Sequence, residues 1–228
     1  MTPGIPPGRG VRVIGDVHGD AAAFRLAAQT GLFVVQLGDL VDEGPDSAGA
    51  LGVMFDLIDA GDGLFILGNH DFKLARALGG AQVQIGPALS ATLAGLDAPT
   101  RARASAEIGR APAWLRWGTA FFVHAGFHTA MLDHPSPCGP ARRADGVLAR
   151  ALFGEPTGRR QADGFPERSL GWVDRIPPGL VVYCGHDRRS RDGRPWTLEG
   201  AAGGRAVFLD TGAGKGGHLS WIDLPAQG

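Results

Sequence analysis

Three short apolar segments of this chain each end in a glycine that is followed by side chains able to bind metal ions. Stretches with a helical spacing of apolar residues separate them, which predicts a β-α-β-α-β unit with parallel strands and right-handed crossovers. The carboxyl ends of such strands meet at one edge of a sheet, where open α/β sheets bind their ligands. The expected strands are Val11–Ile14 before Gly15-Asp16-Val17-His18-Gly19, Leu32–Leu37 before Gly38-Asp39, and Leu64–Leu67 before Gly68-Asn69-His70-Asp71.

Two later strands carry the same kind of ending. Thr119–Val123 leads into His124-Ala125-Gly126, and Leu180–Cys184 leads into Gly185-His186. We interpret Arg205–Leu209 and His218–Leu224 as an antiparallel pair joined by a hairpin turn, because Gly212-Ala213-Gly214-Lys215 lacks the first glycine of a phosphate-binding loop. The expected helices are Ala21–Gln29, one from Asp46 or Ser47 to about Asp59, Phe72–Leu78, Ala88–Leu96, Arg101–Ile108 and Gly146–Phe153.

The chain of 228 residues is long enough for one domain with a large core. Residues 1–10 are rich in proline and glycine, and we expect a flexible lead-in there, followed by a domain over residues 11–228. Residues 128–179 form a proline-rich, loop-rich segment, which we expect to cover the site.

Charge and composition exclude several classes of protein. A net charge of −1 provides no strong field for nucleic acid, so we expect no stable nucleic-acid complex. No apolar run reaches the roughly 18 residues of a membrane span, and the N-terminus lacks the core of a signal peptide, which predicts a cytoplasmic protein. Cys138 and Cys184 form no CxxC pattern, so a disulfide framework is not expected.

The polar residues at the strand ends have the chemistry of metal ligands. An Asp and a His between two glycines can also form an ordinary turn. Four of the seven histidines nevertheless lie at the strand ends, which favours metal binding. Carboxylate and imidazole ligands without thiolate suit Mn, Fe, Zn or Ni. They are too many for one tetrahedral ion, whereas two ions that share a carboxylate accommodate them, activate water and neutralise phosphate charge.

These motifs resemble those of the calcineurin-like metallophosphoesterases, nearest the phosphoprotein phosphatase branch. The matching stretches run over most of the chain in the expected order: Gly15 to Gly19, Gly38-Asp39-Leu40-Val41-Asp42-x-Gly44, Gly68 to Asp71, His124-Ala125-Gly126 and Gly185-His186. The resemblance implies a single α/β domain built as a β-sandwich flanked by helices (an α-β-β-α arrangement), not a plain doubly wound sheet.

The same resemblance implies a role for each motif residue. His70 becomes the general acid for the leaving alkoxide and Asp42 orients it, since an imidazolium beside a carboxylate stays protonated near neutral pH. The cofactors implied are two divalent ions, manganese first, with iron, zinc or nickel as alternatives. Asp16 and His18 hold the first metal, Asp39 bridges both, and the second is completed by Asn69, His124 and His186.

One position departs from the family pattern. The family usually has an arginine directly after the position of Asp42, where it grips the substrate phosphate, and this chain has Glu43. A carboxylate there would repel phosphate. Either Glu43 turns away from the site, or another arginine substitutes, or the affinity for phosphate is low; alternatively, Glu43 is a surface residue with tuning effects only. The candidate replacements are Arg168, Arg188 and Arg189.

The leading prediction is hydrolysis of a phosphomonoester by a hydroxide that two metal ions activate, with His70 as acid. The alternatives are a phosphodiesterase or 2′,3′-cyclic phosphodiesterase, a diadenosine polyphosphate hydrolase, and a non-enzymatic metal-binding scaffold. Asp46–Leu78 and Leu152–Gly158 are similar to the phosphatase module of bacterial polynucleotide kinase-phosphatases, although no kinase or ligase module is present. The expected partner is a phosphorylated substrate, namely an RNA-end phosphate, a phosphoprotein or a nucleotide, and no membrane.

Overall fold

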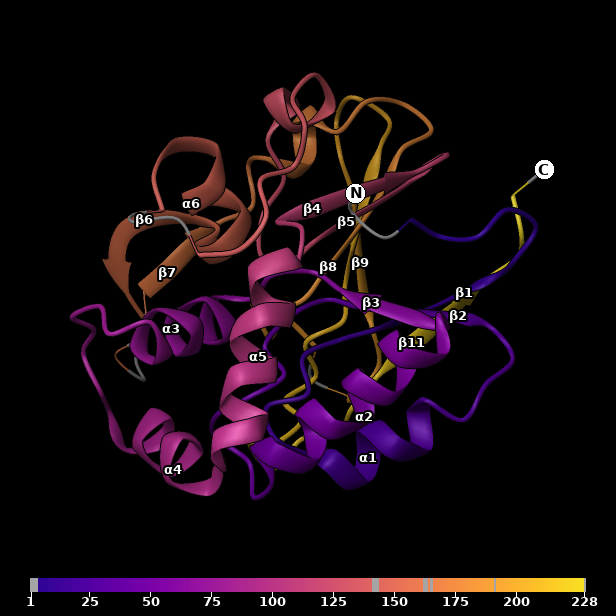
Figure 1. Cartoon of the computed structure of the whole chain (residues 1–228). Coiled ribbons are helices and arrows are strands. Elements are labelled where there is room, and N and C mark those ends of the chain that lie inside the picture. Colours follow the sequence, from indigo (N-terminus) through magenta and orange to yellow (C-terminus); the bar gives the residue numbers. More distant parts are fainter. Residues whose placement is uncertain (1–3, 141–143, 162–163, 165, 191, 228) are drawn as a thin grey trace.

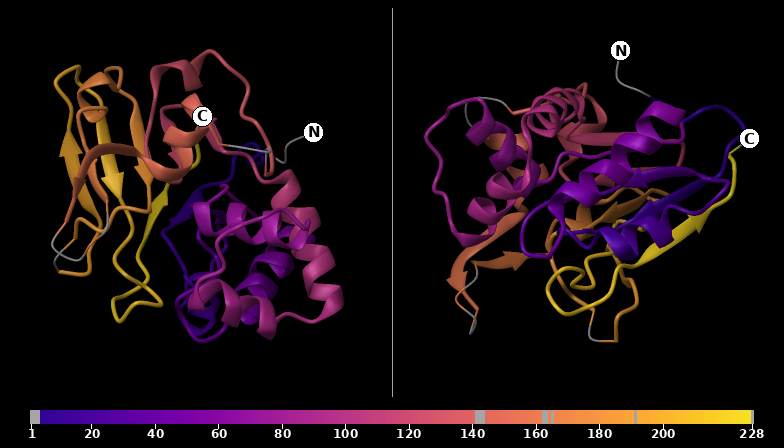
Figure 2. Two further views of the ribbon diagram at one scale, coloured as in Figure 1. Left: turned by 90° about the vertical axis from the view of Figure 1, so that its left-hand side faces the viewer. Right: turned by 60° about the horizontal axis from the view of Figure 1, so that its bottom comes forward.

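The computed structural model describes residues 4–140, 144–161, 164, 166–190 and 192–227. Residues 1–3 of the expected lead-in therefore lie outside the described residues. Two main sheets lie against each other, and the helices of the N-terminal half cover the outer side of one of them (Figures 1 and 2). The expected fold class, an α/β domain with a sandwich of two sheets and flanking helices, is confirmed.

The first sheet contains the expected β-α-β-α-β unit. Strand β1 is parallel to β2 and β2 is parallel to β3, whereas β11 runs antiparallel along the other edge of β1. Helices α1 (Ala21–Ala27) and α2 (Ser47–Ala60) form the crossovers, and the side chain of Asp46 caps α2 as expected by accepting the N–H of Gly49. The strand order is β11 (Trp221–Leu224), β1 (Val11–Ile14), β2 (Phe33–Gln36) and β3 (Gly63–Phe65).

The second sheet has five strands, and three of them are parallel. The outer strands β4 and β9 are antiparallel to their neighbours, and neither was expected as a strand. Strand β9 alternates apolar with polar residues over only four positions, and Arg116 interrupts the apolar residues of β4, so neither is a continuous apolar run. The order is β4 (Trp114–Trp117), β5 (Ala120–Val123), β8 (Val181–Cys184), β10 (Arg205–Phe208) and β9 (Trp196–Glu199).

The predicted hairpin between Arg205–Leu209 and His218–Leu224 is wrong. Strand β10 pairs with β8 and β9 in the second sheet, whereas β11 pairs with β1 in the first. The intervening residues therefore link the two sheets and do not form a simple hairpin turn. Two adjacent apolar strands indicate burial, but their sequence does not specify which strands they pair with.

Alternation along the strands divides the core into layers. In the first sheet, Val13 and Val35 pack between the two sheets, whereas Ile14 and Val34 face the helices. In the second sheet, Phe122 packs toward the first sheet, whereas the neighbouring Phe121 faces outward. The central strands of both sheets are thus buried on both faces. Packing between the sheets therefore sets the distance between the carboxyl ends of the strands in one sheet and those in the other.

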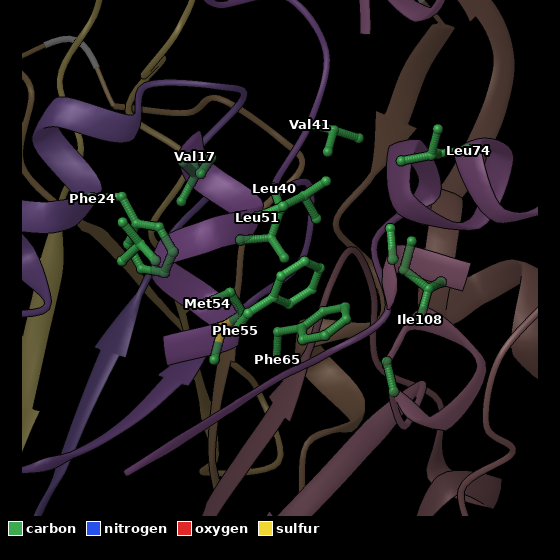
Figure 3. Close-up of a cluster of buried hydrophobic side chains, with 14 of the residues drawn as sticks. Val17, Phe24, Leu40, Val41, Leu51, Met54, Phe55, Phe65, Leu74 and Ile108 are labelled. Carbon is green, nitrogen blue, oxygen red and sulfur yellow. The ribbon is translucent and has the colours of Figure 1, made fainter. Parts of the chain in front are cut away.

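The layer of helices on the first sheet is completed by α3 (Asn69–Leu78), α4 (Pro87–Gly95) and α5 (Ala98–Arg110). Figure 3 shows part of this core, in which Phe24 of α1 and Phe55 of α2 lie in the same cluster as Phe65 of β3. Each of these side chains is at least nine-tenths buried, and such burial contributes about 1.5–3 kcal/mol per large apolar side chain. The helices therefore hold β1 to β3 rigidly.

The loop-rich segment 128–179 contains short elements that pack on the outer face of the second sheet. Helix α6 (Gly146–Phe153) has the expected bounds, and Trp172 and Val173 are buried against Phe121 and its neighbours. The other elements are the 3-10 helices η1 (Thr129–Leu132) and η2 (Val173–Arg175), and the separate hairpin of β6 (Glu155–Arg160) and β7 (Pro166–Ser169). None of the helices in the described part of the chain is both long and apolar enough to cross a membrane.

Candidate metal centre

The polar residues that follow the strands of both sheets meet at one place. Asp16 and His18 follow β1 and Asp39 follows β2, while Asn69 and His70 begin α3 directly behind β3. His124 follows β5 and His186 follows β8 in the second sheet. The sandwich therefore brings together residues that are up to 170 positions apart in the sequence, as the N–H of His186 donates to Asp16 at 3.0 Å.

Two groups of possible metal ligands share one carboxylate. The first group is His18, Asp39 and His70, and the second is Asp39, His124 and His186. Within each group the ligand atoms lie within 4.8 Å of one another. A carboxylate common to both groups is the arrangement that two neighbouring ions require.

Backbone carbonyls orient two of the histidines. Nδ1 of His18 lies 3.2 Å from the carbonyl oxygen of Val41, and Nδ1 of His124 lies 2.8 Å from that of Leu37. A carbonyl only accepts, so both Nδ1 atoms carry a proton, and Nε2 is left to face the carboxylates. Nε2 of His18 lies 3.6 Å from Asp39 Oδ2 and 3.8 Å from Asp16 Oδ2.

The centre concentrates buried negative charge. Burial, together with the charges of Asp210 and Asp39, raises the pKa of Asp16 well above its ordinary value. Burial alone would lower the pKa of His124, but the charge and hydrogen bond of Asp39 outweigh it and raise this pKa to about 9. The carboxylates therefore draw a proton to Nε2 of His124, the atom from which a metal ion would displace it.

These residues fit a divalent metal. Nε2 of His186 is buried and has no hydrogen-bond partner among the described residues. The pKa of His186 is well below its ordinary value because of burial and the positive charge of His124, so its imidazole is neutral and can bind a cation. Buried carboxylates, neutral imidazoles and the amide oxygen of Asn69, 2.9 Å from His124 Nε2, form a donor set for such an ion.

Among the described residues, positive φ at non-glycine positions occurs only in or next to this centre. In the described part of the chain, the non-glycine residues with positive φ are His18 (46°), Asp39 (58°), Asp42 (70°), Glu43 (65°) and His186 (63°). Such conformations are costly for these residues and persist where the surroundings impose them, which occurs most often at functional sites. The close packing is extreme at Gly185, where a Cβ atom would lie 1.8 Å from Asp16 Oδ1.

Two supporting residues were not identified from the sequence. The buried carboxylate of Asp71 accepts the backbone N–H groups of Asp39 at 2.7 Å and Leu40 at 3.0 Å, and so fixes the turn behind β2. The side-chain amide of Gln36 donates to the carbonyl oxygen of Gly38 at 2.7 Å and to that of Gly15 at 3.2 Å. A glutamine inside an apolar strand was the available signal, since a buried amide needs partners.

His70 lies in a chain of hydrogen bonds that starts on α2 and α4. Its Nδ1 is 2.7 Å from Asp42 Oδ2, and the hydroxyl of Thr92 donates to Asp42 Oδ1 at 2.7 Å. Ser47 Oγ lies 3.1 Å from the Thr92 hydroxyl and accepts the N–H of Asp42 at 3.0 Å. Burial by itself would lower the pKa of His70, but the charge of Asp39 and the hydrogen bond to Asp42 raise it above its ordinary value.

Residues 11–137 match the family model described as calcineurin-like phosphoesterase. The chain belongs to this family. A bis(5′-nucleosyl)-tetraphosphatase (asymmetrical) of Anoxybacillus flavithermus is 25% identical over 236 residues, which cover 93% of this chain and 89% of that protein. A protein of the same name from a Geobacillus species is 27% identical over 241 residues, with coverage of 94% and 90%.

Solved structures show the same fold. A protein serine/threonine phosphatase from Saccharomyces cerevisiae superposes with a TM-score of 0.63 at 15% identity, covering 97% of this chain and 81% of that one. A cold-active protein tyrosine phosphatase gives a TM-score of 0.59 at 16% identity, with coverage of 98% and 83%. The predicted family is thus confirmed, and the protein is a metal-dependent hydrolase of phosphoesters.

Two of the three arginines that were candidates for binding phosphate donate hydrogen bonds elsewhere in this phosphoesterase, and the third is exposed. Arg168 donates to the carbonyl oxygens of Phe153 at 2.6 Å and Pro166 at 3.0 Å. Arg189 donates to Asp187 Oδ2 at 2.6 Å. The guanidinium of the exposed Arg188 packs over Gly212, where a Cβ atom would lie 2.7 Å from its Cζ. None of them donates a hydrogen bond to a ligand candidate within the described part of the chain.

A cation that the sequence did not reveal reaches the centre of the phosphoesterase. Lys215 lies in the link between β10 and β11, and its Nζ is 2.9 Å from His18 Nε2. Asp210 in the same link is buried and raises the pKa of Asp16. The glycines around Lys215 were the available signal, but they were interpreted as a hairpin turn because the sequence does not show which sheet receives β11.

Proposed function

We propose that this phosphoesterase hydrolyses a bis(5′-nucleosyl) polyphosphate of the diadenosine tetraphosphate type. The observation that carries the proposal is the similarity to proteins named bis(5′-nucleosyl)-tetraphosphatase along nearly the whole of both chains, with 93% of this one and 89% of the relative covered. A coverage of 93% is much more than the stretch of residues 11–137 that defines the family, so the similarity also extends into the C-terminal part of the chain.

The ligand candidates divide between two metal positions in this proposal. We assign Asp16 and His18 to the first, Asp39 to both, and Asn69, His124 and His186 to the second, with manganese as the first choice of metal because these oxygen and nitrogen donors suit it. Asp16 joins the first group through its distance of 3.8 Å from His18, and Asn69 joins the second through its distance of 2.9 Å from His124. His70, which also lies in the first group, is assigned a different role. When bound, two such ions lower the pKa of water and neutralise the charge of the phosphate that is attacked. The chain itself holds the carboxylates and imidazoles at short distances, so little reorganisation accompanies binding.

His70 acts in this proposal as the general acid. Its Nδ1 is held by Asp42 at 2.7 Å, which leaves Nε2 to present a proton to the leaving oxygen. The raised pKa of His70 keeps this proton in place near neutral pH. Asp42 is a positioning residue, since it is 2% exposed and acts on the reaction through the histidine.

The second candidate function is hydrolysis of a phosphomonoester, and the hydrogen bond between His70 and Asp42 is the observation that favours it. An alkoxide is a poor leaving group and needs a proton in the transition state, so a positioned acid is most useful for an alcohol monoester. The phosphate leaving group of a dinucleoside polyphosphate is more acidic and needs this proton less. The sensitivity of each substrate to the loss of His70 therefore distinguishes the two functions.

A substrate panel tests the proposal. The purified protein is assayed with Mn²⁺, Ni²⁺ and Zn²⁺ in parallel against diadenosine tetraphosphate, a phosphopeptide, an RNA 3′-phosphate and a 2′,3′-cyclic nucleotide. We expect the highest kcat/KM for diadenosine tetraphosphate. A higher kcat/KM for the phosphopeptide or for the RNA 3′-phosphate would refute the dinucleotide proposal and favour the monoesterase.

The acid is tested with His70→Asn, and His134→Asn on the exposed surface serves as control. We expect kcat on an alkyl phosphomonoester to fall about 10²–10⁴-fold, the usual range for a general acid, with unchanged manganese content. The loss should be smaller for diadenosine tetraphosphate. Equal kcat values for His70→Asn and the wild type on both substrates would show that His70 is not the acid.

A further inference from the structure

The position where the family usually carries its phosphate-gripping arginine contributes no cation here. Glu43 is exposed, has a φ of 65° and forms no ion pair among the residues that the structure describes. Arg168 donates to carbonyl oxygens, Arg189 donates to Asp187, and the exposed Arg188 packs over Gly212. Among the described residues, none of the three forms an ion pair with Asp16 or Asp39. Even with metal ions held by Asp16 and Asp39, Glu43 would present a carboxylate where the family usually presents a cation, and a negative charge there disfavours phosphate binding.

Lys215 is the cation that the fold delivers to this place. Its ammonium lies 2.9 Å from His18 Nε2, and it forms no ion pair with a carboxylate in the described ranges. Its positive charge disfavours protonation of His18, His70 and Asp210, although other groups leave the pKa of His70 and of Asp210 above the ordinary value. An ammonium on a flexible four-carbon stem, with three donors, binds phosphate as a point charge.

Lys215 lies in the link between β10 and β11, and this link packs against the turn that contains His18. Gly214 packs so closely on His18 that a Cβ atom would lie 2.2 Å from its carbonyl oxygen, and its φ is 69°. The N–H of Lys215 donates to the carbonyl oxygen of Gly212 at 3.1 Å, and the N–H of Gly217 donates to the same oxygen at 2.8 Å. These contacts hold the backbone of Lys215 beside His18.

We propose that Lys215 binds the substrate phosphate and replaces the arginine that the family usually carries at the position of Glu43. This inference rests on the proposed function, because it assigns a residue that receives the phosphate of the same substrate. Nε2 of His18 has one lone pair, so a metal ion and the ammonium cannot both use it. If His18 held a metal ion through Nε2, the ammonium of Lys215 would have to leave this atom, and its three donors would then be available to a phosphate.

The decisive measurement is the affinity for inorganic phosphate, because it requires no turnover. The manganese-loaded wild type is compared by titration calorimetry with Lys215→Met, with Lys215→Arg, and with Lys73→Met as matched control. Lys73 is the only other lysine of the chain, so both methionine variants change the net charge by the same amount. Manganese content is measured in all four proteins.

We expect Lys215→Met to raise the Kd of phosphate about tenfold or more, as the loss of a charge-assisted contact does. Lys73→Met should match the wild type, Lys215→Arg should recover part of the affinity, and manganese content should stay constant. A Kd for Lys215→Met within about twofold of the wild type would overturn the proposal. A fall in manganese content in Lys215→Met would also overturn it, because Lys215 would then support the metal centre.

These outcomes separate the two proposals. If the wild type binds phosphate through Lys215 but does not prefer diadenosine tetraphosphate, the proposed substrate fails and the assignment of Lys215 stands. If diadenosine tetraphosphate is the preferred substrate and Lys215→Met leaves its KM and the Kd of phosphate unchanged, the assignment of Lys215 fails alone.

Discussion

The hydroxyl of Thr92 is expected to hold His70, the proposed general acid, in place through Asp42. It is buried in α4 and donates to Asp42 Oδ1 at 2.7 Å, while the other oxygen of Asp42 binds His70 Nδ1 at 2.7 Å. Thr92→Val keeps the shape of the side chain and removes the hydroxyl. Asp42 then loses its donor at Oδ1, and Ser47 loses the acceptor 3.1 Å from its Oγ. Linked hydrogen bonds of this kind reinforce one another.

The magnitude follows from the charge on Asp42. A hydrogen bond to a charged group contributes about 1.5–3 kcal/mol, and about 1.4 kcal/mol corresponds to a factor of ten. Thr92→Val should therefore lower the free energy of unfolding by up to about 3 kcal/mol. If the same energy positions His70 in the transition state, kcat should fall about 10–100-fold with little change in KM. Thr92→Ser, which keeps the hydroxyl, should stay close to the wild type.

The assay combines steady-state kinetics on the preferred substrate with denaturant unfolding and a measurement of manganese content. Full kcat in Thr92→Val, together with a reduced free energy of unfolding, would show that the chain of hydrogen bonds stabilises the fold but does not position the acid. Loss of manganese would show that Thr92 supports the metal centre. Either result would refute the reasoning.

Two further predictions concern stability. Arg12 binds Asp223 through two contacts of 2.7 Å and holds the pKa of that carboxyl below its ordinary value. The ion pair therefore stabilises the folded state above pH ~4, and this contribution is lost as the pH falls. Asp223→Asn should lower the free energy of unfolding by no more than about 1 kcal/mol at pH 7, because the pair is partly exposed, and an equal difference at low pH would contradict the ion pair. Chelation of the metal should abolish activity and lower Tm. Mn²⁺ at about 100 times its Kd should raise the free energy of unfolding again by about 2.7 kcal/mol. A Tm that does not depend on Mn²⁺ would contradict a metal centre in the folded state.

Much of the centre could be predicted from the sequence because local rules govern it. Residues that follow apolar strands point to the carboxyl edge of a sheet, so Asp16, Asp39 and His70 could be located without knowing the partners of each strand. The boundaries of α2 could be predicted in the same way. Asp46 has a side chain that caps the start of a helix, and Gly61 readily adopts the left-handed conformation that ends one.

Other features depend on pairings between distant segments. The sequence of β10 and β11 indicates two strands, but only the tertiary structure shows that they belong to different sheets. The same holds for Thr92. In the sequence it is an ordinary polar residue of a helix, and only the packing of α4 beside Asp42 gives its hydroxyl a partner. A hydrogen bond between residues 50 positions apart leaves no periodic signal in either segment.

The sequence by itself determined the family, the chemistry of the ligands and the absence of the expected arginine at Glu43. Only the tertiary structure decided which cation lies near the metal ligands. The physical reason is that a charge acts through space, whereas sequence patterns report local backbone geometry. Lys215 lies 197 positions from His18 in the chain and 2.9 Å from it in the fold, because the link between the two sheets closes over the first metal-binding turn.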